Sequence, residues 1–392
     1  MLTFATPYLE TEEASARVLC YFEDDERKGE IFFEVPSEYG AYLCDARSDA
    51  YVIAALPYAM RTRQDIICDA PVTENLLFQI ETELVPAMSK KSALYPTKIF
   101  AATAPVLPKK SYLDQKTGLE KVGAVGTGFS LGTDSFYAVA TLRDERFPHQ
   151  QLTHLAQHDI GAFNNSYRQF GRTAARDVLF DRSRECAAEL DIPLLQTKSN
   201  LKASLPGDFE LIATFNNIFA TYCMQEFWES YHLGSHGCGL TPLIFDDMES
   251  QHSAFYDILT LECLSIPGLR LYSSGMSETR MEKIWALAHL KEAQTYLHVC
   301  SAESSNCMKC EKCKRTLVCL DILDRLDLFS GSFDVAYYRE HRLEYLAWLC
   351  KIVDRGNLRD LLVYESIYEA LTEKEKDTVQ LIRKALDSQK RH

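Results

Sequence analysis

The feature that most restricts the fold of this chain is a glycine-rich segment between an expected strand and an expected helix. The apolar run Val122–Phe129 predicts a short buried strand, and a helical pattern begins at Asp134. Residues 126–135 between and around them read GTGFSLGTDS. A loop in this place directs several free backbone N–H groups to one point, where the helix dipole adds partial positive charge. The segment therefore predicts a site for an oligophosphate.

Two common phosphate motifs do not fit this segment. The lysine of G-x-x-x-x-G-K-[ST] is missing, which excludes that type of nucleoside triphosphatase. The glycines are spaced G-x-G-x-x-x-G, one residue away from the dinucleotide fingerprint. Gly132 permits a close backbone approach, and Ser130, Thr133 and Ser135 offer hydroxyl groups. The alternative is a strand-to-helix turn that binds no ligand.

Residues 130–135, SLGTDS, resemble the S-G-G-x-D-S loop of the PP-loop ATP pyrophosphatases, with Leu131 in place of the first glycine. In that family the loop holds the pyrophosphate end of ATP, and the enzyme cleaves between the α- and β-phosphates. The resemblance implies ATP and Mg²⁺, with Asp134 helping to hold the metal and Ser135 also catalytic. For Asp134, the alternative is a helix-terminal residue that complements the dipole. The implied nucleotide contacts are Phe129, Ser130, Leu131, Gly132, Thr133, Asp134 and Ser135.

A second motif is the cysteine run Cys307-x-x-Cys310-x-x-Cys313, with Cys300 seven residues before it. Thiolates at this spacing converge on one cation, and four of them complete a tetrahedral zinc shell. A ferredoxin-type run would place its next cysteine four residues after Cys313, followed by proline, which is not the case here. Cys319 is the alternative fourth ligand, although its apolar helical neighbours favour core packing.

Together the loop and the cysteines resemble the 7-cyano-7-deazaguanine synthases, a PP-loop family, over roughly residues 122–316. The resemblance implies an ATP-dependent ligase that forms AMP and pyrophosphate. Such an enzyme adenylates a carbonyl oxygen of a small purine-like or 7-deazapurine-like substrate and replaces it with nitrogen from ammonia. Two alternatives stay open: the same activation used for sulfur insertion, which gives a thioamide or thio-base, and a non-catalytic nucleotide-binding module.

Further candidate residues follow other expected strands and helices. Asn216, in a segment expected to be the first turn of a helix, and Gly234, after a strand, are candidate nucleotide contacts. Arg280, with Lys283 beside it, is a candidate catalytic cation, and a solvated helix face is the alternative. Sulfur transfer would need a persulfide carrier outside the metal site, for which Cys238 and Cys263 are the candidates.

Alternating strands and helices from Val122 to about Leu297 predict an α/β fold with a parallel sheet. We expect three domains: a mixed α+β unit at 1–115, a PP-loop domain with the four-cysteine zinc site at 119–330, and a helical appendage at 331–392. Outside the loop, the expected strands are 30–35, 152–156, 193–197, 231–234 and 269–273. The expected helices follow Ser48 and Thr73 and include 172–190, 211–228 and 281–289.

The composition limits the classes of partner that we expect this protein to bind. The chain has 42 Lys+Arg against 56 Asp+Glu, a net charge of −14, which argues against a nucleic-acid-binding surface. No apolar run approaches the ~20 residues that span a bilayer. Thirteen cysteines, an odd number that lie mostly singly, suit a reduced cytoplasm. We expect a cytoplasmic protein that takes a small-molecule substrate and either ammonia or a sulfur donor. Its oligomeric state is open, and a homodimer is compatible with the sequence.

Overall fold

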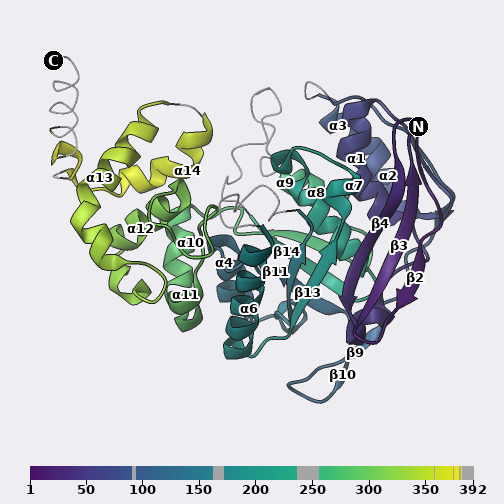
Figure 1. Cartoon of the computed structure of the whole chain (residues 1–392), viewed down its shortest axis with the longest axis horizontal. Coiled ribbons are helices and arrows are strands. Elements are labelled where there is room, and N and C mark those ends of the chain that lie inside the picture. The colour runs from purple at the N-terminus through teal and green to yellow at the C-terminus, as the bar shows by residue number, and fades with distance from the viewer. Residues whose placement is uncertain are drawn as a thin grey trace.

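The computed structural model describes residues 1–90, 94–161, 172–235, 256–356, 358–373, 375–378 and 381. The molecule is elongated, with a large sheet toward one end and a group of helices toward the other (Figure 1). The sheet has eleven strands, and helices cover it. The five strands that come from residues 124–274 pair parallel with one another. The α/β class expected from the sequence is confirmed.

The parallel part of the sheet surrounds the strand that precedes the glycine-rich loop. Across the sheet it consists of β15 (Arg270–Ser274), β14 (Trp228–Gly234), β11 (Ala124–Gly128), β12 (His154–Asp159) and β13 (Leu194–Ser199). All four neighbouring pairs in this row are parallel. The middle strand, β11, is therefore bonded on both sides, and the loop after it leaves the sheet between the ends of two neighbours.

Small residues let β11 pack closely against β14. A Cβ atom on Gly126 would lie 2.5 Å from the indole ring of Trp228, which is fully buried. Trp228 also pairs with Ala124 as the first residue of β14. The helix expected over 211–228 is therefore too long, because residue 228 already belongs to strand β14. The helices linking this part are α4 (Thr133–Leu142), α6 (Arg172–Leu190), α7 (Leu201–Ser204), α8 (Phe209–Tyr222), α9 (Asp257–Cys263) and α10 (Arg280–Leu287).

The sheet continues without a break into the first hundred residues. Strand β13 pairs antiparallel with β4 (Lys28–Pro36), which pairs with β3 (Ser15–Glu23). The domain boundary expected near residues 115–119 stays a prediction, and the sheet itself runs across it. The remaining strands are β1 (Leu2–Phe4), β2 (Tyr8–Thr11), β5 (Ile66–Cys68), β6 (Val72–Thr73), β7 (Ile99–Phe100), β8 (Thr103–Ala104), β9 (Ser111–Leu113) and β10 (Glu120–Val122).

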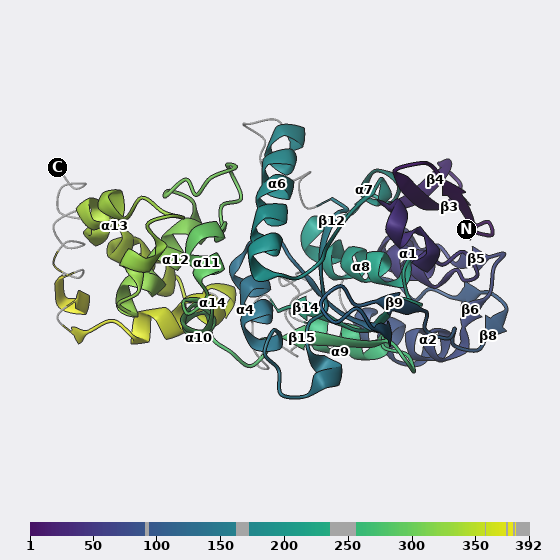
Figure 2. The same ribbon diagram turned by 90° about the horizontal axis from the view of Figure 1, so that it is seen from below.

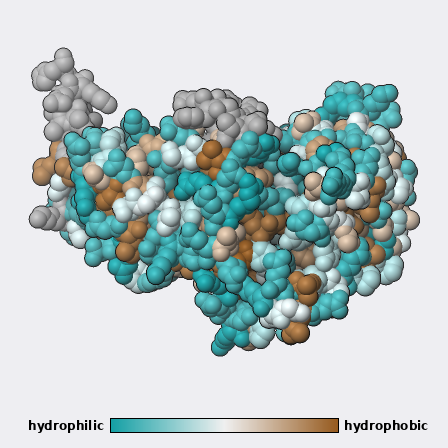
Figure 3. All heavy atoms as spheres, turned by 60° about the horizontal axis from the view of Figure 1, so that its bottom comes forward, coloured by the Kyte–Doolittle hydropathy of each residue, from teal (hydrophilic) through white to brown (hydrophobic). Residues whose placement is uncertain are grey.

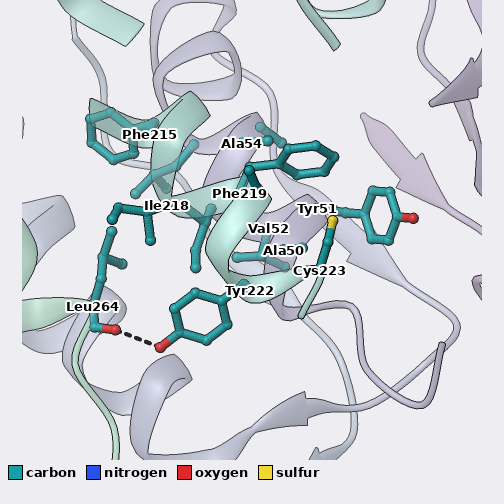
Figure 4. Packing of buried hydrophobic residues seen from close by; sticks show 14 of the residues in the cluster. Ala50, Tyr51, Val52, Ala54, Phe215, Ile218, Phe219, Tyr222, Cys223 and Leu264 are labelled. Atoms are coloured by element: carbon teal, nitrogen blue, oxygen red, sulfur yellow. Dashed lines mark hydrogen bonds between the residues drawn. The ribbon is translucent and has the colours of Figure 1, made fainter. Parts of the chain in front are cut away.

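Two large hydrophobic cores are formed by the described residues. The first joins the N-terminal strands to α8 and to α1 (Asp49–Thr62), the helix expected after Ser48. Figure 4 shows α1 and α8 side by side, and the ring centroids of Tyr51 and Phe219 are 5.8 Å apart. The Tyr222 hydroxyl donates to the Leu264 carbonyl at 2.5 Å. The helix expected after Thr73 appears as α2 (Glu74–Gln79), which a π-helical segment connects to α3 (Val85–Met88).

The second core links α4 to the C-terminal helices. It contains the apolar faces of α10, α11 (Lys291–Tyr296), α12 (Glu311–Ile322), α13 (Val335–Val353) and α14 (Leu358–Glu369). Helix α10 contacts α4, α12 and α14, so the expected helical appendage packs against the part of the chain that follows the sheet. In Figure 2, α4 lies between the sheet and these helices.

The surface is mixed in character. Figure 3 shows one face on which hydrophilic side chains surround small hydrophobic patches. Exposed apolar side chains include Leu113, Leu119 and Val122, on or beside the β9–β10 hairpin. Within the described ranges, none of the helices has the length and apolar character needed to cross a membrane.

Candidate functional site

The glycine-rich loop lies at the carboxyl end of β11, as the sequence predicts. The Phe129 N–H donates to the Ala156 carbonyl of β12 at 2.7 Å, which holds the start of the loop against the sheet. Helix α4 begins at Thr133, and its N-cap is Gly132, which supplies no capping side chain. The Ser135 hydroxyl donates to the Gly132 carbonyl at 2.9 Å. The first amides of α4 therefore remain without a side-chain cap, as at an anion site.

Leu131 adopts a conformation that leucine rarely takes. Its φ is 60°, in the left-handed region, which costs a non-glycine residue roughly 1–2 kcal/mol. The side chain is fully buried in the second core, and the carbonyl accepts the His298 N–H at 2.8 Å. Glycine occupies this position in the S-G-G-x-D-S pattern, and the backbone conformation gives the physical reason. Here core packing and one hydrogen bond hold leucine in it.

Two cations from α10 converge on Asp134 in the first turn of α4. Arg280 Nη1 lies 3.0 Å and Lys283 Nζ 3.3 Å from Asp134 Oδ1. The Lys283 ammonium also donates to the Ser235 carbonyl at 2.7 Å. Arg280 is 5% exposed and Lys283 is 0% exposed, so the solvated helix face considered as an alternative is wrong. Burial lowers the pKa of Lys283, while Asp134 acts in the opposite direction.

The start of α10 explains how these cations are positioned. Thr279 and Glu282 form a capping box, in which the Glu282 carboxylate accepts the Thr279 N–H at 2.7 Å. The helix therefore begins at Arg280, and the i, i+3 spacing places Lys283 on the same face. Gly275, before α10, has a φ of 73°, and a Cβ there would lie 2.8 Å from the Lys283 side chain.

Gly234 is brought directly to the loop, whereas Asn216 is not. A Cβ on Gly234, the last residue of β14, would lie 3.1 Å from the Asp134 backbone. Asn216 lies in the middle of α8 rather than in its first turn, because the helix begins at Phe209. Its buried amide donates to the Ile160 carbonyl, just beyond β12, at 3.2 Å. A nucleotide contact for Asn216 stays a prediction.

The four predicted metal ligands do come together. The sulfur atoms of Cys300, Cys307, Cys310 and Cys313 all lie within 4.8 Å of one another. A tetrahedral zinc site with Zn–S bonds of about 2.3 Å has edges of about 3.8 Å, so the arrangement fits zinc after a small contraction. Cys319 is fully buried in the apolar face of α12 and does not belong to this group. The fourth sulfur atom of the group is therefore that of Cys300.

Backbone amides and one asparagine organise the cysteine loop. The amides of Ala302 and Glu303 donate to Cys300 Sγ at 3.4 and 3.3 Å, an arrangement suited to a thiolate. Hydrogen bonds from Cys310 and Cys313 lower the pKa of Cys300. Asn306 accepts the Val299 N–H at 3.0 Å and donates to the carbonyls of Leu297 and Ser332. Sequence reasoning missed Asn306, for which the only signal is its position just before the first C-x-x-C.

The two candidate sulfur carriers have different outcomes. Cys238 lies outside the described residues. Cys263 is buried at the end of α9, and burial raises the pKa of its thiol to about 11. A protonated and buried thiol is a poor nucleophile.

Comparisons with known proteins leave the chain without an assigned relative. No family model, no curated protein and no solved structure matches it. The loop, its cations and the cysteine site therefore carry the functional argument.

Proposed function

We propose that this protein is an ATP-dependent enzyme that forms AMP and pyrophosphate. It adenylates a carbonyl oxygen of a small purine-like or 7-deazapurine-like substrate and replaces that oxygen with nitrogen. The observation that carries the proposal is the loop 129–132 at the end of β11. It leads into an uncapped helix whose Asp134 is bonded to two buried cations.

The loop supports a grip on an oligophosphate. The amides of the first turn of α4 supply donors and a positive dipole end, and Ser130 and Thr133 add hydroxyl groups. Asp134 orients the Arg280 guanidinium and the Lys283 ammonium at the same end of the sheet. Cations held in place before the reaction lower the energy of the charge that develops on a departing pyrophosphate. In this assignment Ser135, bonded to the Gly132 carbonyl, keeps the loop in shape.

The reaction solves a leaving-group problem. A carbonyl oxygen of the substrate attacks the α-phosphorus of ATP, and the bond to the β-phosphate breaks, releasing pyrophosphate. Ammonia then attacks the activated carbon, and AMP leaves with the original oxygen. The protein must align the substrate oxygen with the α-phosphorus and keep water away. Mg²⁺ when bound would neutralise phosphate charge, and Asp134 is the residue proposed to help hold it.

Zinc has a structural role in this proposal. Four thiolates complete a tetrahedral shell and leave no open position for substrate or water. Nitrogen is favoured over sulfur because every cysteine outside the cluster is buried in the part of the chain that the structure describes. None of those thiols is placed to carry a persulfide at the surface of a site.

The test is the identity of the phosphorus products. The zinc-loaded full chain is incubated with Mg-ATP, a 7-deazapurine carboxylate and ammonium, and the products are followed by ³¹P NMR. We expect AMP and pyrophosphate, and no ADP. Sulfide in place of ammonium tests the alternative. If ATP is bound but no AMP forms with any purine-like or 7-deazapurine-like carbonyl substrate, the enzymatic proposal is refuted in favour of a nucleotide-binding module.

A further inference from the structure

The glycine-rich loop is bonded to the cysteine segment, residues 297–313, at its most strained residue. Leu131 has a φ of 60°, and its carbonyl accepts the His298 N–H at 2.8 Å. The Leu131 side chain is 0% exposed and belongs to the same buried cluster as Val299, Cys300 and Met308. Both the backbone and the side chain of this residue are therefore held by the segment that carries the four cysteines.

Asn306 links that hydrogen bond to the cysteine cluster. Its side-chain amide donates to the Leu297 carbonyl at 2.8 Å, and its Oδ1 accepts the Val299 N–H at 3.0 Å. These two residues flank His298, so Asn306 fixes the backbone on both sides of the N–H that reaches the loop. Asn306 also directly precedes Cys307 in the sequence. A metal ion that held the sulfur atoms in place would therefore hold this connection in place as well.

The conformation of Leu131 bears on anion binding because it sets the direction of the amides that follow. Turns that contain a left-handed residue direct successive backbone N–H groups to one side, where they form a concave anion site. Leu131 is followed by Gly132, the N-cap of α4, and by the uncapped first turn of that helix. A leucine left to itself favours other backbone conformations by about tenfold or more. The loop therefore keeps its shape only while Leu131 is held.

We propose that Leu131 is a positioning residue of the oligophosphate site, and that the metal-loaded cysteine segment holds it in the left-handed conformation. The proposal rests on the oligophosphate site of the proposed function but not on its adenylation chemistry. A glycine would take this conformation without support, so the leucine makes the site depend on the cysteine segment. The dependence is reciprocal: a residue that resists the left-handed conformation also weakens the hold on zinc.

The first measurement is the zinc affinity of the full chain, by competition with a coloured chelator, for Leu131→Gly and Leu131→Ala. Both variants lose the buried side chain, and only alanine keeps the cost of a left-handed backbone. Leu131→Ala should therefore bind zinc about tenfold more weakly than Leu131→Gly. At a position with an ordinary φ the order would be reversed, because glycine is there the more costly residue. Equal affinities, or tighter binding by Leu131→Ala, would overturn the proposal.

Arg63 provides the matched control for this comparison. It follows α1 in the first core with a φ of 58°, and its guanidinium lies 3.7 Å from the centre of the Tyr95 ring. Arg63→Gly and Arg63→Ala differ in the same backbone cost, and they should bind zinc within about twofold of each other. A difference as large as that at position 131 would show a general effect of stability on zinc binding, and it would contradict the specific link to the loop.

The second measurement is the affinity of the zinc-loaded chains for inorganic tripolyphosphate, by calorimetry. Leu131→Gly should bind nearly as tightly as the parent, whereas Leu131→Ala should bind about tenfold more weakly. If Leu131→Ala binds as tightly as Leu131→Gly, Leu131 does not position the site. If the parent binds no tripolyphosphate, the proposed function fails, and the order of the zinc affinities still decides whether the cysteine segment holds Leu131.

Discussion

The two cores of this protein treat charged groups in opposite ways. In the first core, Asp49 is fully buried and accepts hydrogen bonds from the Thr73 amide and hydroxyl, at 2.7 and 2.6 Å. Asp257, equally enclosed, accepts the Thr214 hydroxyl at 2.5 Å. Burial raises the pKa of both carboxyl groups. Asp49 is satisfied by neutral neighbours, and Asp257, whose Oδ2 has no partner among the described residues, favours its protonated form.

Beside the second core, the described part of the chain brings two cations to one carboxylate. Arg280 and Lys283, both buried, meet at Asp134. An arginine cannot be neutralised by losing its proton in a protein, so Arg280 stays charged and the Asp134 carboxylate helps to balance it. The first core thus favours neutral forms of its buried acids, whereas ionised groups persist beside the loop after β11. The predictions below test that difference.

The largest effect should follow loss of the metal site. Cys310→Ser removes one of four thiolates, and structural zinc contributes about 10 kcal/mol or more to the folding of small metal-dependent modules. We expect the second core to melt at a clearly lower temperature than the first, followed by near-UV circular dichroism. Cys319→Ala is the control, because it should lose some stability and keep one zinc per chain by metal analysis. Loss of zinc from the Cys319 variant would contradict the ligand assignment.

Asp134→Ala leaves two buried cations without their carboxylate. Breaking a buried ion pair from one side costs about 3–5 kcal/mol, which urea unfolding will measure. Asp327→Ala is the matched control. Its pairing with Arg339 at 2.7 Å is exposed, so we expect a loss of less than about 1 kcal/mol. Equal stabilities of the two variants would show that the Asp134 cluster is not a buried charge network.

Asp257 should make the first core sensitive to pH. Its pKa is raised from 3.8 to about 7, so the folded state favours the protonated acid. The stabilisation is fully present below pH 4, declines as the pH rises toward 7, and is lost above it. Over that range Asp257→Asn should become more stable relative to the parent by about 2–4 kcal/mol. Parallel pH profiles of the two proteins would exclude this role.

Gly234→Ala should have a smaller effect, confined to the loop site. The new Cβ would meet the Asp134 backbone at 3.1 Å and push α4, at a cost of about 1–3 kcal/mol. We expect weaker ATP binding along with the lower stability. Gly331→Ala is the control, because its nearest neighbour is the Thr295 Cα at an ordinary 3.6 Å. An unchanged ATP affinity in Gly234→Ala would separate β14 from the site.

Local signals predicted much of this structure. The helical spacing of residues 172–190 gave α6 with both ends correct, and the SLGTDS segment gave the strand, loop and helix in order. The cysteine spacing selected the four sulfur atoms that the structure brings together. These features depend on residues that are close together in the sequence, so a sequence pattern can predict them.

The errors came from long-range packing. The helix expected over 211–228 extended too far. Trp228 is compatible with a helix or a strand, and its pairing with Ala124 places it in the strand. The convergence of Arg280 and Lys283 on Asp134 depends on how α10 packs against α4. The left-handed backbone of Leu131 could be predicted only from the glycine that the PP-loop pattern has in its place.

The central claim is that the loop after β11 grips the oligophosphate of a nucleotide. Its most direct test is the affinity of the zinc-loaded chain for Mg-ATP and for AMP, measured side by side by calorimetry. The account predicts that ATP binds at least about tenfold more tightly than AMP, and that Arg280→Met removes most of the difference. Equal affinity for ATP and AMP, or no binding of either, would contradict it.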